Sequence, residues 1–474
     1  MANSLFVEGL IENNTGKLIG APKSDLHNHS TKGCTLKWVE ERTGHSFPAP
    51  PETFDGLEGM QNWFTTYVKP FCSGDEGIVF RWEGAFAEAG RNNIKRLAMN
   101  FGATEIELVG GIDKFRELIL GFHMKYCPET VFEPELTYIS ACDIDSATDS
   151  IDEYIKNGFF KSLDVCGGEN IRPFEAFIPL YRKAEHYGLT KIIHVGESGS
   201  ADDVRKAVEV LGLDEVHHGI GAATSKDTMR FLADNHIQLN VCPSSNVMLR
   251  YAKDYEHHPI KTLVENGVEV TINTDDLLIF NSSIENEYLK LYKAGTLSVE
   301  QLEEIRLRQY KEADAVTIAQ WIQDKDTFMK WGGELFGEFP INGDIIADVY
   351  KNKNGLCMEK DNFYPWIAFD ESGAVGHFIM RYLNGDNKTL RFGWVIIDGN
   401  IRGKGYGTEM LRLGMKYAFE ILGVEKITIG VFENNSRAHA CYKRVGFHDT
   451  EIVKKDPWNV VEMEILKEEY LSAN

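Results

Sequence analysis

Four short polar motifs recur along the first part of this chain, and each of them ends a run of apolar, β-branched residues. They are His27-Asn28-His29, His194-Val195-Gly196-Glu197, His218-Gly219 and Asn273-Thr274-Asp275-Asp276. Two adjacent acids such as Asp275 and Asp276 are costly to bury without a cation or a polar partner. A fold that fits this chain must therefore bring the ends of several strands around one polar centre.

Up to about residue 304, short strand-like runs alternate with longer amphipathic segments. The predicted strands are 24–27, 104–108, 136–140, 162–165, 191–195, 215–218, 238–242 and 268–273, and predicted helices between the later ones are 174–186, 201–211, 225–235 and 259–266. This alternation indicates a parallel sheet covered by helices. Eight repeats predict an α/β fold with a (β/α)8 barrel, in which chemistry lies at the C-terminal ends of the strands. An open doubly wound sheet also fits the alternation, but it would not bring the four motifs together.

Two further stretches depart from this rhythm. The segment 38–81, rich in proline and aromatic residues, can form a lid or pocket wall, or a satellite hydrophobic cluster on the barrel rim. From about residue 305 the pattern changes to predicted strands at 305–310, 366–369, 374–382, 390–397, 426–431 and 460–466, with helices at 313–323 and 408–422. A chain of 474 residues usually divides its core. We therefore expect two domains, 1–304 and 305–474, the second of α+β type.

The composition narrows the class of partner. The chain has 50 Lys and Arg against 72 Asp and Glu, a net charge of −22 that disfavours nucleic-acid polymers and anionic membranes. Small molecules are the expected partners. Eight scattered cysteines without a C-x-x-C pair suggest neither a disulfide framework nor a thiolate zinc site. Acidic residues interrupt the apolar start and no run could span a bilayer, so a cytoplasmic location is expected. The oligomeric state stays open.

The histidine motifs predict a metal centre. His27 and His29 are two residues apart, so on a strand their side chains share one face and can chelate one ion. His194 adds a third imidazole and Asp275 a carboxylate. Imidazole and carboxylate without thiolate suit zinc or another first-row divalent ion. A single catalytic ion could lower the pKa of a bound water from ~15.7 to about 7.

Neighbouring residues complete this predicted centre. Glu197 can protonate a leaving group or a ring nitrogen, although it would also suit a helix N-terminus. His218 can orient the attacking water, whereas His217 should point the opposite way because strand side chains alternate. The same alternation separates Asp276 from Asp275, so Asp276 is expected to accept a hydrogen bond from the substrate.

These motifs, together with Val216-His217-His218-Gly219 and Cys242-Pro243-Ser244-Ser245-Asn246, resemble in order those of adenosine deaminases over about residues 20–300. The resemblance implies a zinc-dependent aminohydrolase on a (β/α)8 barrel, with zinc on His27, His29, His194 and Asp275. It implies that Glu197 protonates the purine N1, that His218 acts on the zinc water and that Asp276 contacts N7. Gly167, in Asp164-Val165-Cys166-Gly167, would contact the substrate through its backbone amide.

One segment departs from that family. Its members usually carry a ribose-binding aspartate two positions after the second histidine, where this chain has Thr31, and one residue is inserted before Gly33. Lys32 could meet an anionic substrate or stand solvated. The expected substrate is therefore a purine-like amine, with adenosine as the leading candidate.

A glycine-rich motif in the second half, Arg402-Gly403-Lys404-Gly405-Tyr406-Gly407, lies between a predicted strand and helix and can cradle a phosphate. With Glu433-Asn434-Asn435-Ser436-Arg437-Ala438 and Cys441-Tyr442-Lys443-Arg444-Val445-Gly446-Phe447, it resembles the GNAT N-acetyltransferases over about residues 305–474. The resemblance implies that the glycine-rich motif holds the pyrophosphate of acetyl-CoA, that Asn434 touches the cofactor and that Tyr442 protonates the thiolate. Residues 391–395 lack the glutamate base of many members, which leaves water or an acid such as Glu433.

The sequence thus predicts a bifunctional enzyme, a zinc-dependent aminopurine deaminase joined to an acetyl-CoA-dependent N-acetyltransferase of unknown acceptor. Two alternatives stay open. The acetyltransferase could be active beside a barrel that only senses a ligand, or the barrel could be a different metal-dependent amidohydrolase.

Overall fold

The structure is a computed structural model that describes residues 5–21, 23–128, 130–169, 171–305, 308–309, 314–359, 362–370, 373–383 and 388–473. It divides into two compact units, Met1–Ile305 and Arg306–Asn474. Among the described helices, none is both long enough and apolar enough to cross a bilayer.

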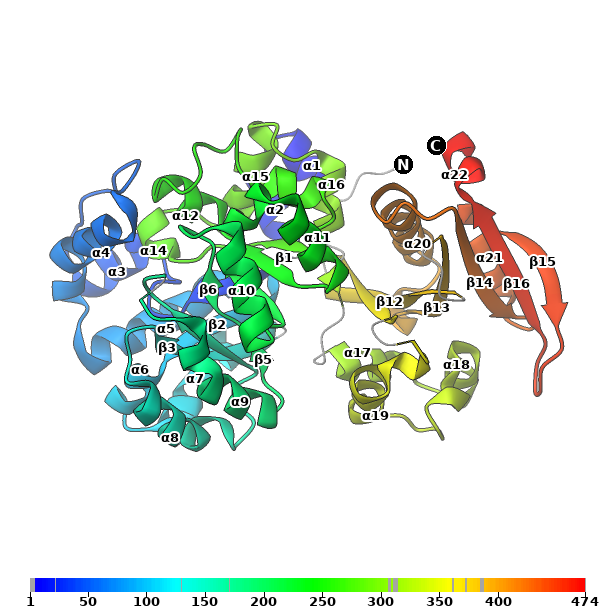
Figure 1. Cartoon of the computed structure of the whole chain (residues 1–474), viewed down its shortest axis with the longest axis horizontal. Coiled ribbons are helices and arrows are strands. Elements are labelled where there is room, and N and C mark those ends of the chain that lie inside the picture. Colours follow the sequence, from blue (N-terminus) through cyan, green and yellow to red (C-terminus); the bar gives the residue numbers. More distant parts are fainter. Residues whose placement is uncertain are drawn as a thin grey trace. The chain divides into compact units, whose positions relative to one another are not determined.

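The first unit is a barrel of parallel strands (Figure 1). Its strands are β1 (Lys23–His29), β2 (Ile94–Gly102), β3 (Val131–Ile139), β4 (Ser162–Cys166), β5 (Thr190–Lys191), β6 (His194–Val195), β7 (Glu215–His218), β8 (Gln238–Val241) and β9 (Val270–Ile272). The pieces β5 and β6 occupy one strand position. The barrel closes beyond β9, where the Asp275 amide donates to the His27 carbonyl at 2.9 Å. The predicted (β/α)8 architecture is confirmed.

Helices surround this barrel. They are α1 (Leu5–Ile11), α2 (Thr15–Gly20), α3 (Leu36–Thr43), α4 (Gly56–Tyr67), η1 (Lys69–Phe71), α5 (Gly74–Arg91), α6 (Ala103–Leu108), α7 (Ile112–Tyr126), α8 (Ile144–Ile155), η2 (Phe174–Phe177), α9 (Ile178–His186), α10 (Ala201–Leu211), η3 (Ile220–Thr224), α11 (Lys226–Asp234), α12 (Pro243–Met248), α13 (Ile260–Glu265), α14 (Leu277–Phe280), α15 (Ile284–Lys293) and α16 (Val299–Ile305).

Helix α10 shows why these segments fold as they do. Ser200 and Asp203 cap each other's backbone amides at its start, and Gly212 ends it with a φ of 62°. Such a cap contributes about 1 kcal/mol. Val204 and Val208, one turn apart, then bury the same face against the barrel.

One predicted strand was wrong. Residues 104–108 lie in helix α6, and the strand at this position of the barrel is Ile94–Gly102 instead. The Glu105 carboxylate accepts a hydrogen bond from the Gly102 amide at 3.2 Å and so begins the helix. The true strand carries Lys95, Arg96 and Asn100, which obscure its apolar pattern.

The insertion at 38–81 packs as the satellite cluster, one of its two predicted forms. Trp63 and Phe64 on α4 contact residues of the loops that follow β8 and β9, including Leu249 and Phe280, in a hydrophobic cluster separate from the barrel core. The Phe64 ring nevertheless reaches the barrel mouth, because its centroid lies 6.0 Å from the Lys32 ammonium.

The second unit is built on a mixed sheet of order β10-β11-β12-β13-β14-β16-β15 (Figure 1). Its strands are β10 (Arg308–Gln309), β11 (Tyr364–Asp370), β12 (Gly373–Tyr382), β13 (Thr389–Ile397), β14 (Lys426–Phe432), β15 (His448–Val453) and β16 (Val460–Leu466). Its helical segments are α17 (Asp314–Trp321), α18 (Lys325–Trp331), η4 (Gly333–Leu335), α19 (Gly343–Ala347), η5 (Asp348–Asn352), η6 (Asn354–Leu356), η7 (Gly399–Ile401), α20 (Tyr406–Lys416), η8 (Tyr417–Ile421), α21 (Ser436–Val445) and α22 (Lys467–Ala473). The strand predicted at 305–310 lies partly outside the described residues, and Ile305 ends a helix.

Two hydrophobic layers cover this sheet. Phe378 and Met380 of β12 pack with α20 on one face, whereas Ile379 packs with Phe328 and Trp331 of α18 on the other. Among the described strands of this sheet, one pair is parallel, β13 and β14, and it is hydrogen-bonded along its first part, from Thr389↔Lys426 to Phe392↔Ile429. The strands then separate, which opens a cavity between their C-terminal ends.

Candidate active sites

Strand ends of the barrel bring the predicted metal ligands together. The Nε2 atoms of His27 and His194 lie 3.0 Å apart, and that of His29 lies 3.4 Å from that of His194. The Oδ1 atom of Asp275 is 3.2 Å from the Nε2 of His29. Four donor atoms from β1, β6 and the loop after β9 thus surround one point.

The opposite nitrogen of each ring is held by the protein. Nδ1 of His27 lies 3.2 Å from the Asn240 carbonyl, and that of His194 lies 2.9 Å from Oδ1 of Asp164. Nδ1 of His29 contacts the Asn100 amide, with Nδ2 at 2.8 Å and Oδ1 at 3.0 Å. The two acceptors favour a proton on Nδ1 of His27 and His194, and the Nε2 atoms of all three rings face one another. Such an arrangement fits a divalent cation, and metal-binding histidines commonly show this outer hydrogen bond.

Left-handed backbone turns modify the alternation on which the sequence prediction relied. His218 has a φ of 64° and Asp275 a φ of 57°. His217 was expected to point away from the site, and this was wrong: its ring stacks on His27 with centroids 3.9 Å apart. Its Nε2 lies 3.1 Å from Oε1 of Glu135, deep in the barrel. His217 therefore forms a buried polar layer beneath the ligands.

Glu197 and His218 face the same centre as Asp275. Ligand atoms of these three residues all lie within 4.8 Å of one another. Burial, followed by the charges of Asp275 and Glu169, raises the pKa of Glu197 well above its usual value. Burial lowers the pKa of His218 to about 3. The site thus combines a carboxyl group whose pKa is raised with an imidazole that is neutral near neutral pH.

Asp276 has an unusual partner at the barrel mouth. The Lys32 ammonium donates to its Oδ2 at 2.8 Å, and its Oδ1 is buried without a hydrogen-bond partner among the described residues. The reading of Lys32 as a solvated side chain was therefore wrong. Thr31 uses its carbonyl to accept from Arg81 at 2.6 Å.

Gly167 and His194 both line a small cavity at the end of β4. Gly167 has a φ of 103°, which L side chains rarely adopt. Just beyond it, Glu169 accepts backbone hydrogen bonds from Gly196, Glu197 and Ser198 at 2.7–2.9 Å. Glu169 thereby fixes the turn that carries the predicted acid.

Sequence reasoning gave no role to several residues that position the ligands, chiefly Asp164, Asn100 and Glu169. Asp164 did carry a signal, because it is an acid within an apolar strand and a buried charge requires a partner. Asn100 was missed because the strand that carries it, Ile94–Gly102, was predicted at 104–108 instead.

In the second unit, the glycine-rich loop 402–407 begins helix α20. Gly403 and Gly405 have φ values of 85° and 99°, and Gly405 is the N-cap residue. The loop's middle residues are exposed, so backbone N–H groups and the helix N-terminus are available to an anion.

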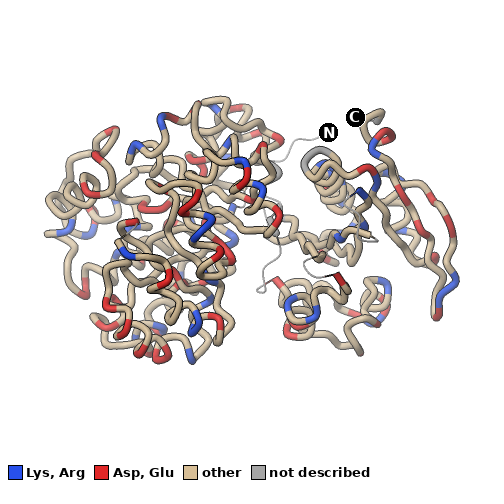
Figure 2. The backbone as a smooth tube through the Cα atoms, in the orientation of Figure 1, with Lys and Arg blue, Asp and Glu red and all other residues tan. Residues whose placement is uncertain are grey.

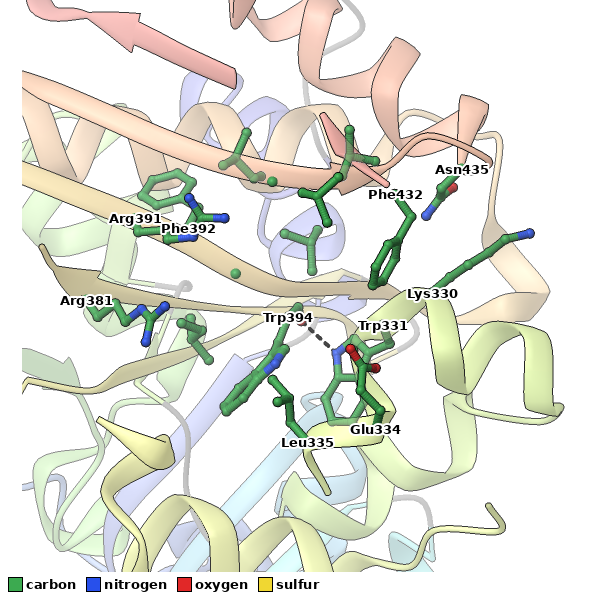
Figure 3. Close-up of a pocket in the computed structure, with 18 of the residues that line it drawn as sticks. Lys330, Trp331, Glu334, Leu335, Arg381, Arg391, Phe392, Trp394, Phe432 and Asn435 are labelled. Carbon is green, nitrogen blue, oxygen red and sulfur yellow. Dashed lines mark hydrogen bonds between the residues drawn. The ribbon is translucent and has the colours of Figure 1, made fainter. Parts of the chain in front are cut away.

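The cavity between β13 and β14, named here the sheet cavity, has a volume of about 410 Å³ (Figure 3). Tyr442 lines it from α21, and burial raises the pKa of its phenol. Asn435 also lines it, whereas the neighbouring Asn434 is exposed. Glu433 is exposed too and accepts from Asn459 at 3.0 Å, so it does not line the cavity.

Comparison with known families agrees with both units. A model described as adenosine deaminase matches residues 142–316, and one described as acetyltransferase (GNAT) domain matches residues 304–448. A Treponema pallidum (strain Nichols) protein, provisionally named adenosine/adenine deaminase, is 31% identical over 280 residues, which are 58% of this chain and 93% of that protein.

Solved structures share the barrel fold. Adenine deaminase from Arthrobacter aurescens aligns with a TM-score of 0.52 at 19% identity, covering 60% of this chain and 92% of that one. An amidohydrolase from Burkholderia ambifaria with bound Zn aligns with a TM-score of 0.53 at 18% identity, covering 72% and 94%. At this identity the likeness concerns the fold alone. Together with the family matches, it means that this enzyme belongs to the adenosine deaminase family and carries a GNAT acetyltransferase domain.

Proposed function

We propose that the chain is bifunctional. Residues 1–304 would hydrolytically deaminate an aminopurine with one Zn²⁺ held by His27, His29, His194 and Asp275, and residues 305–474 would transfer an acetyl group from acetyl-CoA to an amine. The observation that carries the first activity is the convergence of three Nε2 atoms and one carboxylate oxygen, each Nδ1 being held from outside.

In the barrel, the chain's own residues would move protons and hold the purine. A divalent ion in this donor set would supply a hydroxide nucleophile at neutral pH. His218, neutral because burial lowers the pKa of its imidazole to about 3, would orient the attacking water. Glu197, whose raised pKa favours the protonated form, would donate to N1 as the ring is attacked at the amine-bearing carbon. Loss of ammonia would complete the reaction, and the Gly167 amide would contact the base.

The Lys32–Asp276 pair favours a free base over a nucleoside. With Lys32 donating to Oδ2, the buried Oδ1 of Asp276 needs a donor from the ligand. Adenine can carry a hydrogen on N7, whereas N7 of adenosine is only an acceptor. Thr31, at the position of the ribose-binding aspartate, also favours a free base over a nucleoside. We therefore propose adenine as the preferred substrate.

In the second unit, the 402–407 loop would bind the pyrophosphate of acetyl-CoA through backbone N–H groups and the start of α20. Asn434 would contact the cofactor arm. Tyr442, held neutral by burial, would protonate the thiolate that leaves the thioester.

Ammonia release tests the deaminase on a panel of adenine, adenosine and N6-methylated adenines, with zinc content measured in parallel. We expect one zinc per chain and turnover of adenine. Zinc without ammonia from any panel member would reject the deaminase and favour another amidohydrolase activity. Neither zinc nor ammonia would favour a barrel that only binds a ligand.

A thermal shift with acetyl-CoA tests the second activity. We expect the melting temperature of the full chain to rise at saturating acetyl-CoA, because the ligand binds the native state alone. The absence of a shift would reject the acetyltransferase.

A further inference from the structure

The sheet cavity carries an excess of positive charge that acetyl-CoA binding at the 402–407 loop does not explain. Four cationic side chains and one carboxylate line it, namely Lys330, Arg381, Arg391, Lys455 and Glu334. Figure 3 labels all of them except Lys455, and Lys330 pairs with Asp326 at 2.7 Å. Elsewhere both signs of charge are interspersed over each unit, in a chain whose net charge is −22 (Figure 2). A local excess of cations in an acidic protein suggests a specific anionic ligand.

Two of these cations face each other across neighbouring strands. Arg381 of β12 and Arg391 of β13 are direct partners in the sheet register. Like charges directly opposite on antiparallel strands repel, so the arrangement costs stability unless anions balance it.

Only one member of this pair is balanced. Arg391 binds Glu462 through two hydrogen bonds of 2.7 and 2.9 Å. Gly430 leaves room for that bridge, because a Cβ there would lie 2.6 Å from Nη2 of Arg391. Among the described residues Arg381 has no carboxylate partner, and its one hydrogen bond runs from Nη1 to Sγ of Cys357 at 4.0 Å. Its guanidinium is thus available to a ligand that enters the cavity.

The face of the sheet on which Arg381 lies indicates whether it would contact acetyl-CoA or the acyl acceptor. Side chains at alternate positions share a face, so Arg381 lies with Ile379, which packs against α18. Phe378 and Met380 point to the other face, where the glycine-rich loop leads into α20. Arg381 therefore lies across the sheet from the proposed pyrophosphate site, on the side left to the acyl acceptor.

A second group in the cavity, Glu334, has one oxygen without a partner among the described residues. Oε1 of Glu334 lies 3.5 Å from the Lys455 ammonium, and its Oε2 is buried with no hydrogen-bond donor in the described part of the chain. A buried carboxylate oxygen left unpaired is costly, and an ammonium group of a ligand would satisfy it. Figure 3 shows Glu334 beside Trp331 and close to Trp394.

We propose that the acyl acceptor is an amine that also carries an anionic group, a carboxylate or a phosphate. Arg381 binds that anionic group, and Glu334 accepts a hydrogen bond from the amine. The proposal rests on the acetyltransferase function proposed above and names its substrate class.

Matched acceptor pairs test it on the full chain. Tyrosine is compared with tyramine, and O-phosphoethanolamine with ethanolamine, by release of the CoA thiol; spermidine represents purely cationic acceptors. We expect kcat/KM to be at least about tenfold higher for the acidic member of a pair, because a charged hydrogen bond is lost in the other. Which pair responds distinguishes carboxylate from phosphate.

Arg381→Gln should reduce that preference about tenfold to a hundredfold. Arg412→Gln is the matched control, because Arg412 is exposed on α20 and pairs with Glu409 at 3.6 Å. It should leave the preference unchanged. Equal loss for both members of a pair in Arg381→Gln, or a best rate with spermidine or with the members that lack the anionic group, would overturn the proposal.

If acetyl-CoA shifts the melting temperature but no panel member is acetylated, the binding of acetylated products tests whether the acceptor site prefers an anionic group. Titration of N-acetyltyrosine and N-acetyltyramine into the CoA-saturated protein should show tighter binding of the acidic product. Equal or weaker binding of N-acetyltyrosine would overturn the inference while leaving acetyl-CoA binding intact. The lack of any acetyl-CoA shift would instead reject the acetyltransferase function itself.

Discussion

Lys32 and Asp276 form an ion pair of 2.8 Å that links the turn after the first barrel strand to the loop after the last. The Asp276 side chain is 5% exposed and that of Lys32 25% exposed, so the pair is screened only partly by solvent. The pair lies at the barrel mouth, where we expect the purine substrate to be recognised.

Replacing Lys32 should change which purine is preferred. In Lys32→Met, Asp276 loses the ammonium that donates to its Oδ2, and with it the constraint that leaves Oδ1 to accept from an N7–H of adenine. We expect the ratio of kcat/KM for adenine to that for adenosine to fall about tenfold. Lys37→Met, at a side chain 80% exposed, is the control. A parallel fall for both purines, with the ratio preserved, would contradict the role given to the pair.

The hydrogen bond from His194 to Asp164 should set metal affinity. Asp164→Asn keeps the size of the side chain but removes the charge that orients the ring, and such losses commonly weaken metal binding about 10–100-fold. The measurement is zinc retention during titration with a chelator, with His194→Ala as the fully depleted reference. Asp152→Asn, which alters a surface pair with Lys183, should behave as the wild type. Wild-type retention in Asp164→Asn would contradict this.

Loss of the proposed proton donor should affect turnover and not metal content. Glu197→Gln should lower kcat for ammonia release by about 10²–10⁴, because a positioned acid typically contributes that much. Zinc should remain bound. Glu185→Gln, at a side chain 69% exposed, serves as the control. Turnover near the wild-type rate would exclude Glu197 as the acid.

Acid should destabilise the second unit through His377. Burial lowers the pKa of this imidazole to about 4, whereas an unfolded histidine titrates near ~6.5. Between these values the unfolded state binds the proton and the folded state does not, so stability is full above about pH 6.5 and falls as the pH falls. The loss should be about 1 kcal/mol between pH 6.5 and 5.5.

Hydrogen exchange of β12 amides, corrected for the intrinsic effect of pH, measures that loss. In His377→Gln the pH dependence should flatten over the same range. The Tyr350 hydroxyl, 2.7 Å from Nε2 of His377, can still pair with the glutamine amide. An unchanged pH dependence in the variant would assign the effect to another group.

A charge at the start of α20 should abolish acetyl-CoA binding. Gly405→Asp places a carboxylate where the pyrophosphate is expected and a side chain at a φ of 99°. Gly423→Asp is a matched control, since Gly423 also has a left-handed φ, 70°, and open space around it. We expect the acetyl-CoA thermal shift to vanish in the first variant and to persist in the second.

Much of the fold was predictable because local pattern and tertiary structure agree. Helix 201–211 has both caps and a clear apolar face, and the prediction matched its bounds. The second strand failed because Arg96 and Asn100 turn polar groups inward to meet Glu133 and His29, which only the closed barrel brings near. The local sequence around Arg96 and Asn100 does not show which distant residues they will pair with.

The common face of His27 and His29 was predictable from their spacing, but the surroundings of this histidine cluster were not. His27 and His29 lie two apart on a regular strand, so their common face follows from strand geometry. His217 was misjudged because His218 departs from strand geometry, and nothing local to that dipeptide marks a left-handed residue. The charge balance of the sheet cavity depends on Glu462, which lies 71 residues from Arg391.

The left-handed backbone at His218 and Asp275 lets two consecutive residues of one segment face the same centre. Fewer strands are then needed to supply the polar groups of the site, so these groups occupy only part of the barrel rim. The turn after β1, which carries Thr31 and Lys32, contributes none of the proposed metal ligands. Changes in this turn would alter which purine is preferred without disturbing those ligands.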